Sequence, residues 1–151
     1  MYFTTIELPE CQVRHTSCDL TRKCTQPEGQ LSSVNFPNQY FYQGSSCTWQ
    51  IATRESTYIT MRFLAFDVPS WDVCISSFLS IHDGPNDQSY VLGKHCNLHL
   101  PPTNMRTGFN FAYIWLRTTT GNPGAGFHLD YASEVFTPAQ ASANATGKYL
   151  L

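Results

Sequence analysis

Residues 78–86 read FLSIHDGPN, and this stretch decides the class of fold we expect. Leu79 and Ile81 alternate with Ser80, which is the two-residue period of a β-strand with one buried face. The five residues that follow Ile81 are turn-forming types that end the strand abruptly. A short strand that runs directly into a tight turn is typical of an all-β protein.

The same alternation returns on both sides of this stretch. Apolar and polar residues alternate at 47–51 and 59–63 upstream and at 127–131 downstream, and 89–92 is short and β-prone. Residues 109–117 form the longest apolar candidate strand. No window shows the 3.6-residue period of an amphipathic helix. Short strands separated by turns rich in Gly and Pro predict a sandwich of antiparallel sheets.

The composition limits the classes of protein to consider. Of the 151 residues, 42% are hydrophobic and 13% are charged, with a formal net charge of −2. The hydrophobic share suffices for one packed domain, so wholesale disorder is excluded. The few lysines are scattered, which argues against nucleic acid as a partner. No apolar run approaches the roughly 20 residues that span a bilayer, so we expect no membrane insertion.

Six cysteines indicate a disulfide-bonded protein of an oxidising compartment, and none of their spacings is the C-x-x-C of zinc or redox sites. The triplet that begins at Asn144 is a glycosylation sequon, which agrees with an extracellular location. The first residues lack the pattern of a signal peptide. We therefore interpret the chain as a mature fragment or an excised piece of a larger secreted or receptor protein. The six cysteines are Cys11, Cys18, Cys24, Cys47, Cys74 and Cys96.

Six motifs follow one another between residues 24 and 131. They are GQLSSVNFPNQY at 29–40, CTWQI at 47–51, FLAFDV at 63–68, the run from Cys74 to LSIHDG at 79–84, LGKHC at 92–96, and GF at 126–127 with Tyr131. In this order and with these gaps the chain resembles a CUB domain, an extracellular module of complement proteases, developmental metalloproteases and receptors. Val34 departs from the family pattern, which usually has proline at this position.

The resemblance implies a jelly-roll-like β-sandwich of two antiparallel sheets over residues 24–132. Residues 1–23 would then be an N-terminal extension with a small disulfide loop. Residues 133–151 would be a flexible tail or linker. The family's usual disulfides correspond here to Cys24–Cys47 and Cys74–Cys96, which leaves Cys11 to pair with Cys18 unless one of the two bridges to another domain.

Many CUB domains bind calcium at one end of the sandwich through three carboxylates, because a hard cation prefers several oxygen ligands. In this sequence the three positions are held by Pro69, Ser77 and Thr119. Tyr40, which supports the site in the family, is retained, and the nearby Asp67 and Asp72 are the alternative ligands. We expect a domain without calcium or another cofactor. Such a domain would not capture a partner's lysine through ion-bound acidic residues.

The sequence shows no arrangement that indicates catalysis. It contains no nucleophile elbow, zinc-protease helix or P-loop motif. His95 and His99 have a spacing that zinc ligands on a helix use, but an extended segment would hold them about 13 Å apart. His82 and Asp83 are adjacent in a turn, whereas the members of a catalytic triad must converge in space. We therefore expect no enzyme.

Two groups of aromatic residues are candidate binding surfaces. The first is the face of strand 109–117 opposite the core, which should be polar if it were solvated. We favour cover by the chain's own N-terminal segment or tail, and the alternative is a partner interface. The second is the loop end that lacks calcium ligands, where partner contact and packing onto the sandwich edge are equal alternatives. The first group is Phe111, Tyr113 and Trp115, and the second is Tyr40, Phe41, Tyr42 and Trp71.

These observations predict a non-catalytic, calcium-independent interaction module of a larger extracellular protein. Its partner would be another extracellular protein or a neighbouring domain of the same parent protein. One alternative is a glycan-binding module, because residues 38–50 offer aromatic rings beside amides and hydroxyls. The other alternative is an accessory domain of a secreted protease.

Overall fold

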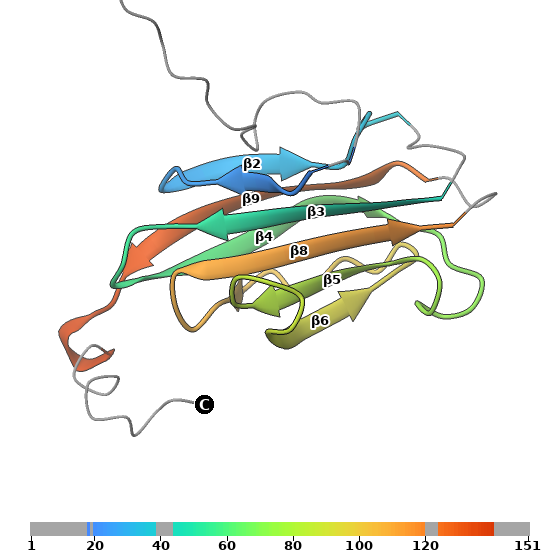
Figure 1. Ribbon diagram of the computed structural model, residues 1–151. Coiled ribbons are helices and arrows are strands. Elements are labelled where there is room, and N and C mark those ends of the chain that lie inside the picture. Colours follow the sequence, from blue (N-terminus) through green and yellow to red (C-terminus); the bar gives the residue numbers. More distant parts are fainter. Residues whose placement is uncertain (1–17, 19, 39–43, 120–123, 141–151) are drawn as a thin grey trace, which may run out of the picture.

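The computed structural model describes residues 18, 20–38, 44–119 and 124–140. Its strands form two sheets, shown as two layers in Figure 1. The five-stranded sheet has the order β1 (Arg22–Cys24), β3 (Ser45–Ala52), β8 (Phe111–Thr118), β5 (Phe78–Asp83) and β6 (Tyr90–His95). The four-stranded sheet has the order β2 (Glu28–Ser32), β9 (Gly126–Val135), β4 (Thr57–Asp67) and β7 (Met105–Arg106). The expected all-β sandwich is confirmed.

The core lies between the two sheets and is filled by the alternating residues of the long strands. Ile114 of β8 is fully buried between Trp49 of β3 and Ile81 of β5, its cross-strand partners. From the opposite sheet, Phe127 of β9 packs edge-on against Trp49, with ring centroids 5.1 Å apart. Ala112, Ile114 and Leu116 form the core face of β8, and all three are buried.

A β-bulge in β4 explains how two phenylalanines three residues apart share the core. In a regular strand, Phe63 and Phe66 would lie on opposite faces. The register of β4 with β9 shifts between Phe63 and Ala65, and the extra residue brings both rings inward. The two rings meet edge-on at 6.2 Å, while Leu64 is 45% exposed.

Three strands of the structure are not predicted by the sequence. β1 and β7 are edge strands of three and two residues, too short to show a period. β2 has a single buried residue, Leu31, because it pairs only with β9. β9 itself continues to Val135, three residues beyond the expected end of the domain at 132.

The predicted pairing of Cys24 with Cys47 is wrong, and so is the predicted pairing of Cys18 with Cys11. Cys18 is bonded to Cys47, with the two Cα atoms 4.8 Å apart. β1 runs parallel to β3 with Cys24 beside Ile51, four residues along from Cys47. Four residues of strand span about 13 Å, and a disulfide needs Cα atoms within about 7 Å.

The other family disulfide, Cys74–Cys96, is confirmed, with a Cα–Cα distance of 5.4 Å. Cys24 is also disulfide-bonded. Cys11 lies outside the described residues.

Candidate functional site

The loop end of the sandwich, where the family places calcium, is closed by neutral contacts. The Oγ of Ser77 lies 3.0 Å from the Oγ1 of Thr119, and the amide of Thr119 donates to the same Ser77 oxygen at 3.1 Å. Ser77 is fully buried. Two hydroxyls that hydrogen-bond to each other and carry no charge do not fit a cation that prefers several anionic or carbonyl oxygens.

Pro69, at the first of the three positions, packs against Gly124. A Cβ built on Gly124 would lie 2.3 Å from the Cδ of Pro69 and 2.6 Å from the carbonyl oxygen of Asp67. The Asp67 carboxylate accepts a hydrogen bond from the amide of Ala125 at 3.0 Å. Asp67 therefore ties the loop that precedes β9 to the end of β4.

The second nearby carboxylate, Asp72, is bound by its own loop. It accepts hydrogen bonds from Ser70 Oγ at 2.9 Å, from the amides of Ile75 and Ser76 at 3.3 and 3.1 Å, and from Ser76 Oγ. The hydrogen bond from the Ser76 side chain is the main cause that lowers the pKa of Asp72 to about 2. No group of three His, Cys, Asp or Glu residues that could hold a metal occurs among the residues the structure describes. Among the described residues of this end, Pro69, Ser77 and Thr119 offer no charged oxygen to a calcium ion.

The same loop carries side chains that project into solvent. Trp71 is 81% exposed, Val73 80% and Ile75 69%. Beside it, the segment after β6 exposes Leu98 and Leu100. We call residues 70–76 and 97–100 the apolar loop pair. Of its exposed apolar side chains, sequence reasoning selected Trp71 alone, because the others belong to no motif.

The aromatic row of β8 lies on the outer face of the five-stranded sheet and is half-buried there. The ring of Trp115 packs edge-on against Phe78 at 5.2 Å, and its Nε1 donates to the Oγ of Ser46 at 2.7 Å. Tyr113 packs edge-on against His82 at 5.8 Å. These rings are thus partnered by neighbouring strands of their own sheet.

Part of the chain folds over this outer face. The turn after β5 crosses toward β3, where Gln50 Nε2 donates to the carbonyl oxygen of Pro85 at 2.8 Å. Beneath it, buried His82 is hydrogen-bonded to Ser80 Oγ and to the carbonyl oxygen of Ser89. These hydrogen bonds of His82 therefore hold the turn after β5 against the sheet. Two residues before β8 begins, Phe109 contacts Phe136 of the expected tail.

Several residues named from the sequence lie outside the described part of the chain. They are Tyr40, Phe41, Tyr42 and Asn144. Among the residues considered for glycan binding, Trp49 is fully buried and Gln50 is bonded to Pro85.

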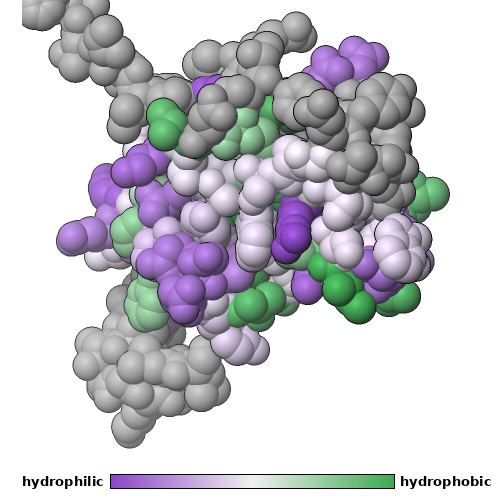
Figure 2. Space-filling view, turned by 45° about the vertical axis from the view of Figure 1, so that its right-hand side comes forward, coloured by the Kyte–Doolittle hydropathy of each residue, from purple (hydrophilic) through white to green (hydrophobic). Residues whose placement is uncertain are grey.

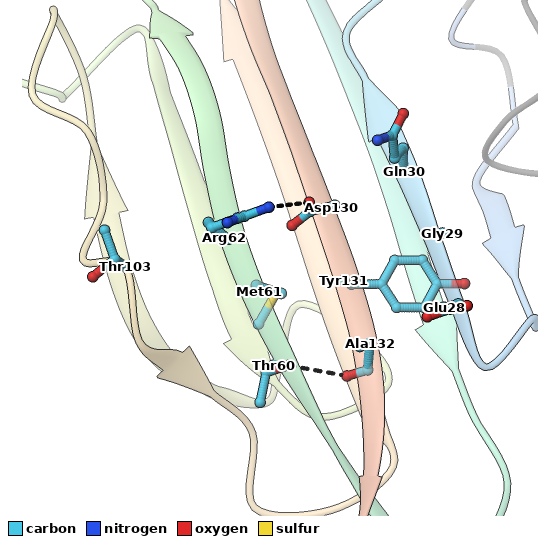
Figure 3. Close-up of a pocket in the computed structure, with 10 residues that line it drawn as sticks. All are labelled: Glu28, Gly29, Gln30, Thr60, Met61, Arg62, Thr103, Asp130, Tyr131 and Ala132. Carbon is cyan, nitrogen blue, oxygen red and sulfur yellow. Dashed lines mark hydrogen bonds and ion pairs between the residues drawn. The ribbon is translucent and has the colours of Figure 1, made fainter.

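A pocket of about 550 Å³ lies on the outer face of the four-stranded sheet (Figure 3). In Figure 3, Arg62 of β4 and Asp130 of β9 point toward each other, with 2.9 Å between Nη2 and Oδ2. This hydrogen bond raises the pKa of Arg62. Gln30 of β2 and Thr103 of the loop before β7 line the sides. Sequence reasoning missed the pocket because its residues come from three strands far apart in sequence.

The family of the chain follows from a match of residues 18–131 to the model of the CUB domain. The chain belongs to the CUB domain family. Human cubilin is 30% identical over 107 residues, which is 71% of this chain and 3% of cubilin. A human MASP-1/3 fragment, CUB1-EGF-CUB2, has a TM-score of 0.67 at 25% identity and covers 80% of this chain and 43% of the fragment. The MASP-1 CUB2 domain bound to Ca2+ has a TM-score of 0.64 at 26% identity and covers 73% of this chain and 96% of that domain.

This chain spans only a small part of the curated relatives it matches, such as 3% of human cubilin and 10% of human tolloid-like protein 2. CUB domains are generally non-catalytic modules within larger proteins, and commonly bind other proteins. Their homologues are extracellular or ectodomain proteins. In the described part of this chain, no helix has the length and apolarity to cross a bilayer.

Proposed function

We propose that this CUB domain is a non-catalytic, extracellular protein-binding module that works without calcium. The observation that carries the proposal is the Ser77–Thr119 hydrogen bond, which fills the loop end with neutral oxygens. Asp67 and Asp72 each accept hydrogen bonds from their own surroundings, and two carboxylates alone fall short of the several oxygen ligands that calcium prefers. Binding must then use contacts other than the capture of a lysine by ion-bound acidic residues.

Membership in the family supports the protein-binding part of the proposal, since CUB domains commonly bind proteins. The glycan-binding alternative has less support. A sugar platform needs an accessible ring, and Trp49, the tryptophan of the stretch considered for it, lies in the core. A role as the accessory arm of a secreted protease concerns the parent protein and is compatible with the same module.

Thermal unfolding in calcium and in EDTA, under non-reducing conditions, tests the calcium part. A ligand present at a hundred times its Kd stabilises the folded state by about 2.7 kcal/mol, equivalent to a rise in Tm of roughly 10 °C. We expect no rise for this chain. The MASP-1 CUB2 domain, which binds Ca2+, is the matched positive control. A calcium-dependent rise in this chain comparable to that of the control would contradict the proposal.

A further inference from the structure

The exposed apolar side chains of this domain are concentrated at one end. Eleven large hydrophobic residues of the described chain are exposed, and five belong to the apolar loop pair. The others are spread over the molecule, as single exposed apolar residues normally are. Apolar surface gathers at the lower right of Figure 2, the end of the sandwich that carries the β4–β5 loop. Contiguous apolar surface of this kind marks interaction sites.

The two segments of the apolar loop pair form one body. The Cys74–Cys96 disulfide joins them. Val68 and Asn97 form an isolated β-bridge at their base, with N–O distances of 3.1 and 2.6 Å. The amide of Ser70 also donates to the Oδ1 of Asn97 at 3.0 Å. The backbone that carries the exposed side chains is therefore constrained, which limits the loop entropy lost when a partner binds.

The loop holds these side chains outward at a cost in stability. Val73 has a φ of 57° and Cys74 a φ of 66°. A β-branched residue in the left-handed region is a true outlier that persists only where surrounding contacts enforce it. The enforcing contacts here are the hydrogen bonds of Asp72 to the amides of Ile75 and Ser76.

The chemistry of the loop pair defines its partner. Asp72 is the only residue with a formal charge in residues 70–76 and 97–100. Its carboxylate is held by hydrogen bonds from its own loop, so a single fixed charge stands beside five exposed apolar side chains. The complementary surface is therefore apolar and uncharged, with burial of Trp71 as the main source of affinity.

We propose that the apolar loop pair is the docking surface of this domain, and that it receives an uncharged apolar segment of another protein. The proposal rests on the proposed function and specifies the surface and the partner chemistry. Both loops contribute, since Leu98 and Leu100 extend the surface that Trp71, Val73 and Ile75 begin.

The test uses a phage-displayed library of random peptides, selected on the full chain in EDTA and, in a parallel selection, in calcium, with no depletion on any variant. Selected peptides should be rich in aromatic and aliphatic residues and poor in lysine and arginine. A synthetic peptide of that kind should bind Trp71→Ser and Leu98→Ser at least roughly tenfold more weakly than the unmodified chain. Raising the salt concentration should leave its affinity unchanged.

Matched controls come from equally exposed side chains elsewhere. Tyr90, on β6, is 75% exposed and Leu20 is 71% exposed. Tyr90→Ser and Leu20→Ser should keep the affinity within about twofold, because neither lies in the loop pair. A further variant, Val73→Gly, should raise Tm by roughly 2–4 °C by relieving the left-handed backbone, yet weaken the peptide about fivefold. Weaker binding by a more stable protein cannot result from misfolding.

Each of the other possible results would overturn a different part of the proposal. Peptides that bind all variants equally would place the site elsewhere and leave the proposed function intact. Lysine-rich peptides whose binding falls with salt would replace apolar docking by charge recognition. Binding only in calcium would overturn the proposed function itself. If phosphatidylcholine vesicles bind the unmodified chain but not Trp71→Ser, the partner would be a lipid surface. A selection that enriches no peptide would refute the proposed docking surface.

Discussion

At the loop end, the residues that stand where the family pattern has metal ligands make structural contacts. Ser77 is buried and shares its hydroxyl with Thr119, and Pro69 packs onto Gly124. The contact at Gly124 is close enough to exclude even one methyl group, because the obstructing atoms include a backbone carbonyl oxygen. This end of the sandwich is therefore stabilised by packing and neutral hydrogen bonds.

Gly124→Ala should destabilise the domain by about 1–3 kcal/mol, because the added methyl displaces Pro69 or the backbone of Asp67. Urea unfolding of the two proteins measures the difference. Gly108→Ala is the matched control, since the nearest atom to a Cβ there is the end of the Asp83 side chain at 3.4 Å. Equal losses in the two variants would show that the Gly124 contact is not specific.

The depressed pKa of Asp72 predicts an acid-side loss of stability. Its pKa lies at about 2 in the folded chain against an ordinary value of 3.8, so the stabilisation by its ionised form is complete above about pH 4. It should be lost as the pH falls from 4 to 2. Asp72→Asn should lower stability at pH 7 and flatten this decline, measured by urea unfolding at several pH values.

Ser76→Ala provides the control, because the Ser76 hydroxyl is the main cause of the lowered pKa. Ser76→Ala should partly flatten the decline in stability as the pH falls from 4 to 2. An Asp72→Asn variant with the same decline as the unmodified chain would show that other carboxylates cause it.

At the scale of elements, strand register decides which cysteines can meet. β1 lies parallel to β3 with Arg22 beside Trp49. This register places Cys24 too far along β3 to bond with Cys47, and Cys18 is bonded to Cys47 instead. The bond fastens Cys18, which precedes the edge strand β1, to the inner strand β3. Spacing along the chain could not distinguish Cys18 from Cys24, since both precede Cys47 by a loop of similar length.

Peptide mapping under non-reducing conditions tests this connectivity. Trypsin leaves Cys24 and Cys47 in one peptide, 24–54, and cleavage after Glu28 separates them. Mass spectrometry should then find peptide 15–22 joined to peptide 29–54 through Cys18 and Cys47. A join between peptides 24–28 and 29–54 would instead show the usual family pairing and contradict the observed register.

For the whole molecule, the two-layer architecture sets where stability is highest. β3, β8 and β5 are inner strands of one sheet, and β9 and β4 are inner strands of the other. Their core faces pack together around Trp49, Phe127 and Phe63. The edge strands β6 and β7 pair on one side alone within the described chain.

Hydrogen exchange should reflect this order. The amides of β8 and β9 should exchange slowest, at rates set by global unfolding, and those of β6 and β7 faster by local opening. Exchange followed by mass spectrometry with peptide-level resolution measures the ranking. Protection of β6 equal to that of β8 would mean that the edge is covered, and would overturn the open-edge arrangement.

The sequence by itself determined the sandwich, through the local two-residue period of its strands, and the uncharged types of Pro69, Ser77 and Thr119. The Cys74–Cys96 bond was implied by the resemblance to the family, and the structure confirms it. Tertiary structure alone decided the Cys18–Cys47 bond, the partners of Trp115 and the union of residues 70–76 with 97–100. These depend on strand register and on loops that converge from distant parts of the chain, and no local pattern encodes such distances.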